Sequence, residues 1–234
     1  MDVLMGILIP FIGTVIGASL VFFMKKELNK KVEIIIYGFA AGVMMAALIW
    51  SLIIPAIESS SVVPVIIGLV IGVGIFYLMD LYFNKKKKIN NLMLAVTLHN
   101  IPEGMAVGVA FASYLVGGLS LAAAYALAIG IAIQNFPEGS VISFPLLKQE
   151  VSKRKAFMYG VISGIFELLG TLVTLLFTNF VVAILPYMLS IAAGAMMYVI
   201  VVELIPESNH QSKLNVIGFL LGFIIMMVLD VMLG

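Results

Sequence analysis

The chain has 234 residues, of which 63% are hydrophobic and 11% are charged, and its mean hydropathy is +1.20. A soluble domain of this size could not bury so many apolar side chains, so the composition excludes that class and indicates an integral membrane protein. The net charge of +1 points to no class of partner, and the absence of cysteine excludes disulfides and thiolate metal sites.

Apolar runs long enough to cross a bilayer, which takes about 20 residues, recur along the whole chain. The first run begins at Val3 and lacks a basic leader and a small-residue cleavage pattern, so we expect a retained helix rather than a signal peptide. No polar interval is long enough for a soluble domain, so residues 1–234 are expected to form one transmembrane domain. The runs predict an all-α membrane protein with eight transmembrane helices, at residues 3–24, 32–57, 62–83, 91–115, 119–147, 153–178, 184–206 and 212–233.

Basic residues alternate between the predicted loops. All 13 Lys and Arg residues fall in the loops that follow the first, third, fifth and seventh helices, and none falls in the other loops. Basic loops face the cytoplasm in membrane proteins. The pattern therefore predicts a multi-pass protein of the cytoplasmic membrane with both termini outside.

Two pairs of similar segments predict an inverted repeat. Ala40-Ala41-Gly42-Val43-Met44-Met45 on the second helix corresponds to Ala192-Ala193-Gly194-Ala195-Met196-Met197 on the seventh, and a proline follows each near the helix end. An Asn-x-Pro-Glu-Gly segment occurs on the fourth helix and again on the fifth. Both pairs are antiparallel because an odd number of helices separates their members. Inverted repeats around a midplane site are typical of transporters, so we expect a 3+2+3 arrangement of helices.

The repeated Asn-x-Pro-Glu-Gly segments carry the chemistry. At helical spacing the acid, the amide and the residue before the amide share one face, and an ionisable residue inside an apolar run indicates a functional site. Each proline also frees a backbone carbonyl one turn earlier. Carboxylate, amide, imidazole and carbonyl groups together suit a divalent cation. The two copies are His99-Asn100-Ile101-Pro102-Glu103-Gly104 and Gln134-Asn135-Phe136-Pro137-Glu138-Gly139.

Other acidic residues differ in what they indicate. Glu167 on the sixth helix lies at a depth comparable to Glu103 and Glu138, and three midplane carboxylates without a membrane-embedded Lys or Arg would repel one another unless a cation bound. Glu167 taken alone could instead be protonated and bond a neighbouring helix. Glu203 is open to ligation and to a structural or gating role. Asp80 and Asp230 lie at predicted helix ends and are expected to be solvated or interfacial.

The paired segments on the fourth and fifth of eight helices, with both termini outside, resemble those of the ZIP (Zrt/Irt-like) metal-ion transporters, and most of all their bacterial zinc-uptake branch. The resemblance spans essentially the whole chain. It implies uptake of Zn²⁺ or a similar divalent ion into the cytoplasm through a midplane site between the fourth and fifth helices. Carried over by position, the primary site would be His99, Glu103 and Glu138, and an adjoining second site would be Asn100, Asn135 and Glu167, with sharing of Glu138 left open.

Gln134 departs from the family pattern, in which relatives often carry a second histidine. An amide oxygen is a harder and weaker zinc ligand than imidazole. Gln134 is therefore kept as a candidate ligand, and Fe²⁺, Mn²⁺, Co²⁺ and Cd²⁺ remain candidate substrates beside Zn²⁺. We expect no prosthetic group and no nucleic-acid partner. The expected partners are divalent metal ions and the lipid bilayer. A homodimer is left open, with the Gly-rich third helix as a hint of a self-association face.

Alternating access is the expected mechanism, with a bundle that holds the fourth and fifth helices moving against a scaffold that includes the second and seventh. A passive channel is the alternative within transport, and a metal-sensing or structural membrane protein is another. An intramembrane metalloenzyme is disfavoured, because His-Glu-x-x-His is absent and a single membrane histidine supplies too few imidazoles for a usual catalytic zinc.

Overall fold

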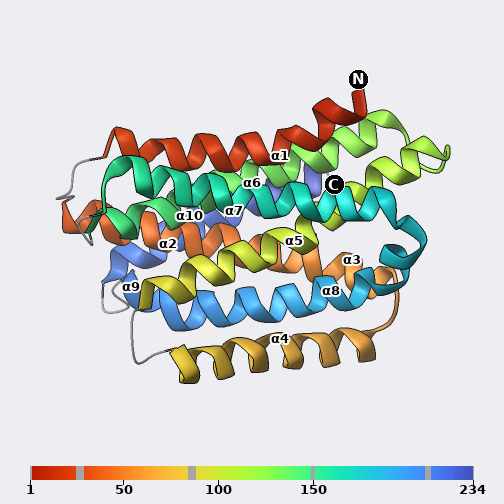
Figure 1. The fold of residues 1–234 in the computed structure, drawn as a ribbon. Coiled ribbons are helices and arrows are strands. Elements are labelled where there is room, and N and C mark those ends of the chain that lie inside the picture. Colours follow the sequence, from red (N-terminus) through yellow and green to blue (C-terminus); the bar gives the residue numbers. More distant parts are fainter. Residues whose placement is uncertain (1, 25–28, 84–87, 149–150, 209–211, 234) are drawn as a thin grey trace.

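The structure is a computed structural model that describes residues 2–24, 29–83, 88–148, 151–208 and 212–233. For some helical residues, among them His99 and Pro102, only the backbone is described. Nearly all of the described residues are helical, and no strand occurs among them (Figure 1). The all-α prediction is confirmed for this part of the chain.

Helical structure occupies each of the eight predicted ranges, and in three of them the helix type changes along the segment. The helices are α1 (Asp2–Ser19) with the 3-10 turn η1 (Leu20–Phe22), α2 (Lys30–Ala47) with the π-helix η2 (Leu48–Ile53) and α3 (Ile54–Glu58), α4 (Val62–Phe83), α5 (Lys88–Leu115), α6 (Leu121–Lys148), α7 (Lys153–Leu176), α8 (Thr178–Val199) with the π-helix η3 (Ile200–Leu204) and α9 (Ile205–Glu207), and α10 (Lys213–Leu233).

One predicted boundary is wrong. The seventh helix begins at Thr178 and not at residue 184, so that Phe177 alone separates α7 from α8. The backbone N–H of Phe177 donates to the carbonyl of Val173 at 3.0 Å and closes the last turn of α7. The apolar residues that follow simply continue as helix, and Pro186 is accommodated inside α8.

Six helical segments among the described residues are long and apolar enough to cross a membrane. They are residues 2–22, 30–58, 62–82, 153–176, 178–204 and 213–232. The two long helices outside this set, α5 and α6, carry the repeated polar segments, and these side chains lower their mean hydropathy. The composition and these helices together identify a multi-pass membrane protein.

The helices form two groups, which meet where α5 packs along α8. In the first group, α1 packs along α6 and α5 packs along α7, and α1 also contacts α7. In the second group, α2 packs along α10 and α4 packs along α8, and η2 also contacts α8. Figure 1 shows α4 beside α8 at one edge of the bundle and α1 at the opposite edge. The first and second groups are called the α5–α6 group and the α2–α8 group below.

Glycines allow the paired helices to approach until their backbones touch. A Cβ added to Gly72 of α4 would collide with the carbonyl oxygen of Ile191 in α8, and one added to Gly68 would collide with Ser190. Close approach through small residues is the usual means of helix association in lipid. These two glycines of the third predicted helix are therefore used within the chain, which removes them as a hint of self-association.

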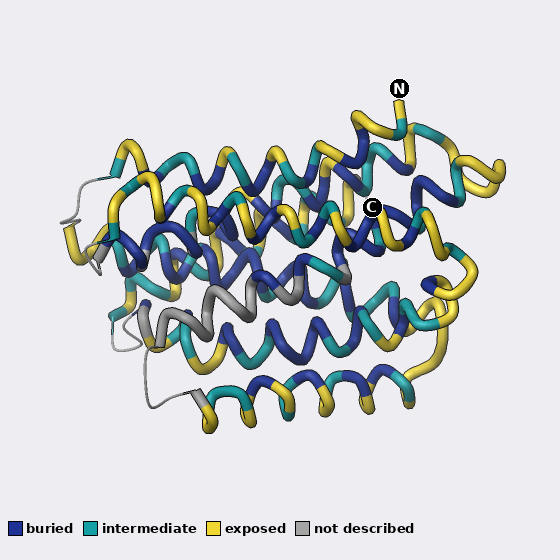
Figure 2. The backbone as a smooth tube through the Cα atoms, in the orientation of Figure 1, coloured by how far each residue is buried: buried dark blue, intermediate teal, exposed yellow. Residues whose placement is uncertain are grey.

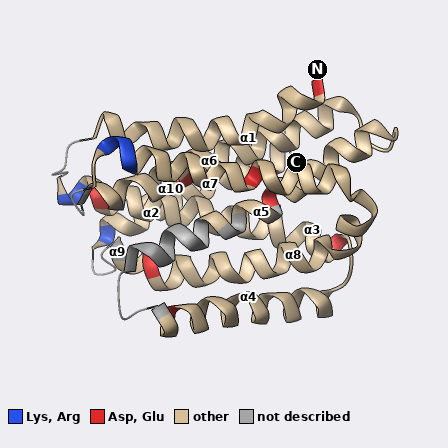
Figure 3. Ribbon diagram, in the orientation of Figure 1, with Lys and Arg blue, Asp and Glu red and all other residues tan. Residues whose placement is uncertain are grey.

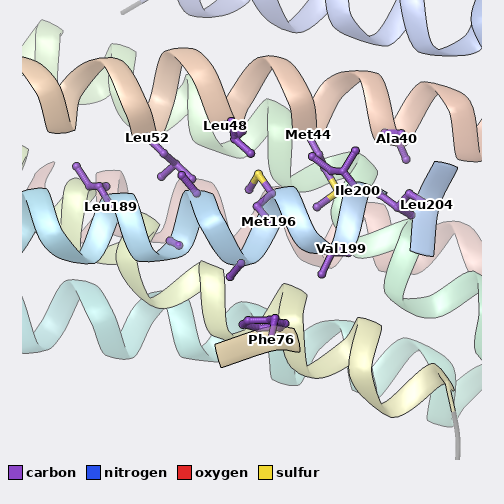
Figure 4. Close-up of a cluster of buried hydrophobic side chains, with 14 of the residues drawn as sticks. Ala40, Met44, Leu48, Leu52, Phe76, Leu189, Met196, Val199, Ile200 and Leu204 are labelled. Carbon is purple, nitrogen blue, oxygen red and sulfur yellow. The ribbon is translucent and has the colours of Figure 1, made fainter. Parts of the chain in front are cut away.

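The Ala-Ala-Gly-x-Met-Met segments meet in one apolar core. Met44 of α2 and Met196 of α8 are each 1% exposed and belong to the same cluster of buried side chains, which Figure 4 shows between the two helices. Their role is the packing role expected of methionine in an irregular core. Figure 2 shows that exposed residues lie along the outer faces of the helices, and on α4 and α10 these are mostly Val, Ile and Leu.

Charge distinguishes the two ends of the bundle. The described Lys and Arg side chains gather at one end, while the N- and C-termini both lie toward the other (Figure 3). Acidic positions also occur midway along the length of the bundle, where no described Lys or Arg lies. The described basic residues thus lie apart from the acids midway along the bundle.

Candidate metal site

Six of the seven predicted site residues have described side chains, and all six are buried. Each is at most 1% exposed although each is polar or acidic. They come from three neighbouring helices of the α5–α6 group: Asn100 and Glu103 from α5, Gln134, Asn135 and Glu138 from α6, and Glu167 from α7. The side chain of the seventh, His99, lies outside the described residues, although its backbone belongs to α5.

The glycine of each repeated segment sets the helix packing around the site. A Cβ on Gly104 would collide with the backbone carbonyl of Glu167, so this glycine lets α7 press against α5 beside Glu103. The hydroxyl of Thr171 donates to the carbonyl of Gly104 at 2.8 Å and fastens the contact. The equivalent Gly139 packs in the same way against Thr14 of α1. The Asn-x-Pro-Glu-Gly pattern therefore brings a second helix to each of its acids.

Amide groups from α6 donate to two of the buried carboxylates. Gln134 donates through Nε2 to Oε1 of Glu103, and Asn135 donates through Nδ2 to Oε2 of Glu167 at 2.8 Å. Glu103 and Glu138 both lie close enough to Glu167 for their charges to interact with its carboxyl group. The acids of α5, α6 and α7 therefore form one electrostatic cluster.

Several buried oxygens in this cluster have no hydrogen-bond donor among the described residues. They are Oδ1 of Asn100, Oδ1 of Asn135 and Oε1 of Glu167. The Nδ2 group of Asn100 donates to the carbonyl and to the hydroxyl of Ser163, each at 3.2 Å, and this fixes which way Oδ1 points. A buried oxygen without a donor is costly, and these are the atoms that a cation would satisfy.

The ligand set is rich in oxygen. Within the described part of the chain no three His, Cys, Asp or Glu side chains stand close enough together to hold a metal ion. A cation bound among these side chains would have amide oxygens as well as carboxylates around it. Hard or borderline divalent ions accept such ligands, so the donor set fits a divalent cation as cargo.

Two further residues reach the site from the α2–α8 group and were not anticipated. The hydroxyl of Ser51 in η2 lies 3.3 Å from Oε1 of Gln134 and 2.9 Å from Oδ1 of Asp230 in α10. Asp230 was expected to be solvated or interfacial, yet its Oδ2 is buried and has no donor among the described residues. A lone serine in an apolar run and an acid near a chain end are weak signals.

Two other acids named above, Glu203 and Asp80, lie in the α2–α8 group. Glu203 is in η3 and is half-buried. Asp80 of α4 accepts a hydrogen bond from the hydroxyl of Tyr198 at 3.0 Å.

The sequence matches a family model described as ZIP zinc transporter over residues 86–230, which include both copies of the repeated segment. It is also similar along its whole length to the zinc transporter ZIP11 of Xenopus tropicalis, at 33% identity over 99% of this chain and 97% of the relative. The chain belongs to the ZIP family. The resemblance carried by His99, Glu103 and Glu138 is thereby confirmed at the level of the family.

Bacterial ZIP proteins are among the relatives. The zinc transporter ZIPB of Bordetella bronchiseptica is 31% identical over 96% of this chain and 79% of that protein. The zinc transporter ZupT of Clostridium perfringens is 30% identical over 97% of this chain and 95% of that protein. ZIP proteins are transporters and not enzymes, so this chain is a membrane transporter of metal ions.

Proposed function

We propose that the chain takes up divalent metal ions, with Zn²⁺ first, into the cytoplasm by alternating access through a midplane site between α5 and α6. The observation that carries the proposal is the cluster of polar side chains from α5, α6 and α7, each at most 1% exposed in a membrane protein. Such groups are expensive inside a bilayer and mark ion pathways. The names of the relatives support zinc as the first cargo to test.

The proposed ligands follow the two repeated segments. His99, Glu103 and Glu138 would bind the ion in the primary site, and Asn100, Asn135 and Glu167 would form the adjoining second site. The buried oxygens of Asn100, Asn135 and Glu167 that accept no hydrogen bond from any described residue support the second assignment. Gln134 would contribute its amide oxygen to the primary site, which makes that site harder than one with two imidazoles and keeps Fe²⁺, Mn²⁺, Co²⁺ and Cd²⁺ as competitors.

Relative movement of the two helix groups would expose the site to each side in turn. All of the proposed ligands lie in the α5–α6 group, whereas α2, α4, α8 and α10 contribute none. The packing pairs also correspond across the chain, since α1 with α6 matches α7 with α5, and α2 with α10 matches α8 with α4. Such correspondence supports an inverted repeat, and inverted repeats allow the two halves to exchange conformations.

The proposed direction of transport follows from charge. The end of the bundle with the described Lys and Arg side chains would face the cytoplasm, and the end with both termini would face outward (Figure 3). The eight helices would then all cross the cytoplasmic membrane. Ions would enter from the side of the termini and leave on the side of the basic loops.

Purified protein in proteoliposomes tests the proposal. Zn²⁺ uptake should saturate with external concentration, and a panel of competing divalent ions should rank the cargo. A channel would give flux that does not saturate, and a sensor or structural protein would bind Zn²⁺ without any flux. Saturable uptake would support a carrier. Asp2→Ala removes an exposed carboxylate at the start of α1 and is the control, which should take up Zn²⁺ as the unmodified protein does.

A further inference from the structure

One hydroxyl group connects the proposed metal site to the other helix group. Ser51 in η2 has its Oγ 3.3 Å from Oε1 of Gln134 and 2.9 Å from Oδ1 of Asp230. Gln134 in turn donates through Nε2 to Glu103. These hydrogen bonds connect α5 and α6 on one side with η2 and α10 on the other. The contact therefore crosses the boundary between the two groups at the site itself.

The contacts fix the orientation of the Gln134 amide. A primary amide presents an acceptor oxygen on one side and an NH₂ donor on the other. A hydroxyl donor lies on one side of Gln134 and a carboxylate acceptor on the other, so the oxygen points to Ser51 and the NH₂ points to Glu103. Divalent cations bind the oxygen of an amide. In this orientation Gln134 competes with a cation for Glu103 instead of helping to bind it.

We infer that Ser51 is a positioning residue that sets the cation affinity of the site by holding Gln134 in its donor orientation. The inference rests on the proposed function above. A cation that binds Oε1 of Glu103 replaces the NH₂ group of Gln134 on that oxygen. The amide must then turn its oxygen toward the cation, as the proposed primary site requires, and this movement breaks its bond to Ser51. The hydrogen bond from Ser51 thus stabilises the empty site and lowers its affinity for the cation.

Asp230 makes the release of Gln134 reversible. A serine hydroxyl has one proton, so Ser51 can give a full hydrogen bond to only one of its two acceptors at a time. While Gln134 is in place, the proton of Ser51 is shared between the two acceptors, and when Gln134 leaves the proton goes entirely to Asp230, 2.9 Å away. The buried hydroxyl of Ser51 therefore keeps a hydrogen-bond acceptor, which avoids the free-energy cost of an unsatisfied buried donor. The bound cation replaces two hydrogen bonds of the Gln134 amide, the one to Glu103 and the one from Ser51.

The location of Ser51 gives the exchange a consequence for transport. Ser51 and Asp230 belong to the α2–α8 group, whereas Gln134 belongs to the α5–α6 group. The bond between Ser51 and Gln134 therefore holds the two groups in register while the site is empty. Cation binding removes that bond, and the loaded carrier is freer to move than the empty one.

Zn²⁺ affinity of the purified protein, measured by calorimetry in detergent, tests the inference. Ser51→Ala removes the hydroxyl, and it should tighten Zn²⁺ binding by about two- to tenfold, the amount that one hydrogen bond supplies. Ser51→Thr keeps a hydroxyl and should bind as the unmodified protein does. Ser143→Ala is the matched control and should leave Zn²⁺ affinity unchanged. The buried hydroxyl of Ser143 donates at 2.9 Å to the carbonyl of Gly139 within its own helix.

A double-mutant comparison separates positioning from a general effect on structure. In a Gln134→Ala background, Ser51→Ala should leave Zn²⁺ affinity unchanged, because the amide that Ser51 positions is gone. If Ser51→Ala does not fold, Ser51→Cys keeps most of the volume with only a weak donor and should shift affinity in the same direction.

Three results overturn the inference. Ser51→Ala could bind Zn²⁺ no more tightly than the unmodified protein, its effect could persist without Gln134, or Ser51→Thr could behave as Ser51→Ala does. In each of these cases the unmodified protein still binds Zn²⁺, so the proposed function stands. An unmodified protein that binds no divalent cation would overturn both.

Discussion

Within the described part of the chain, two of the buried acids accept hydrogen bonds from amide groups. Gln134 donates to Glu103, and Asn135 donates to Glu167. An amide satisfies a carboxylate oxygen without neutralising its charge. A lysine or arginine in the same place would form an ion pair that a metal ion could displace only at high cost. The choice of partner therefore keeps the carboxylates available to a cation.

Gln134 is also the residue that should decide which metal is preferred. We predict that Gln134→His strengthens binding of Zn²⁺ relative to Mn²⁺ by about tenfold or more, because imidazole is a softer and better zinc ligand than an amide oxygen. Competition between the two ions for the purified variant measures the preference. An unchanged ratio would mean that the side chain at this position does not reach the metal.

The sequence predicted the site residues of the repeated segments, but it did not predict Ser51 and Asp230, which are distant from those segments along the chain. Asn100, Glu103, Asn135 and Glu138 share one local pattern, and the pattern predicts their common helix face. Ser51 approaches Gln134 across 83 positions of sequence, and it approaches Asp230 across 179. Contacts of that kind depend on how α2 and α10 pack, which no local spacing encodes.

Pairs of helices in contact through glycine are the main structural elements of the fold. Gly104 allows the backbone of α7 to touch α5 at Glu167, and Gly139 does the same for α1 at Thr14. The glycine of each Asn-x-Pro-Glu-Gly segment is thus a packing residue that holds an acid against a neighbouring helix. The sequence showed that the glycines repeat, but the helix that each one meets is visible only in the fold.

Gly104→Ala should separate α5 from α7. The added methyl group would collide with the backbone of Glu167, and overpacking of this kind costs about 1–3 kcal/mol. We expect a lower melting temperature in detergent and weaker Zn²⁺ binding. Gly74→Ala is the matched control, because no atom lies within 4 Å of its added Cβ, and alanine favours the helix. Equal melting temperatures for the two variants would contradict this account of the packing.

The π-helical turns are elements that hydropathy could not reveal. η2 (Leu48–Ile53) and η3 (Ile200–Leu204) follow the matched Ala-Ala-Gly-x-Met-Met segments, and each lies just before a proline. Their agreement in position supports the repeat between the second and seventh predicted helices. π-helical turns occur often at functional sites, and η2 carries the serine that contacts Gln134.

On the scale of the whole molecule, two groups of four long helices meet along an interface that the site adjoins. Composition, apolar runs and the repeated segments together predicted a membrane transporter of the ZIP family, and the family is confirmed. The division into groups was predicted only in part, because the sequence pairs α5 with α6 and α2 with α8 but does not say which group α1, α4, α7 and α10 join.

Cross-linking between the groups should stop transport. The rings of Tyr37 in α2 and Phe144 in α6 lie 6.4 Å apart across the interface, and the chain has no native cysteine. We predict that Tyr37→Cys with Phe144→Cys, joined through disulfides by a short bis-methanethiosulfonate reagent, loses Zn²⁺ uptake and regains it when a reductant cleaves those disulfides.

The control pair lies within one group. The rings of Phe111 in α5 and Tyr125 in α6 lie 5.8 Å apart, and both helices belong to the α5–α6 group. The same reagent applied to Phe111→Cys with Tyr125→Cys should leave uptake unchanged. Full uptake by the cross-linked Tyr37 and Phe144 pair would rule out movement between the groups.

The central claim is that the buried acids of α5, α6 and α7 exist to carry a divalent ion through the membrane. Its most direct test is Zn²⁺ uptake by proteoliposomes that contain either the unmodified protein or Glu103→Ala at equal amounts of folded protein. The account predicts saturable uptake by the unmodified protein and none above empty vesicles for Glu103→Ala. Equal uptake by the two proteins would contradict it.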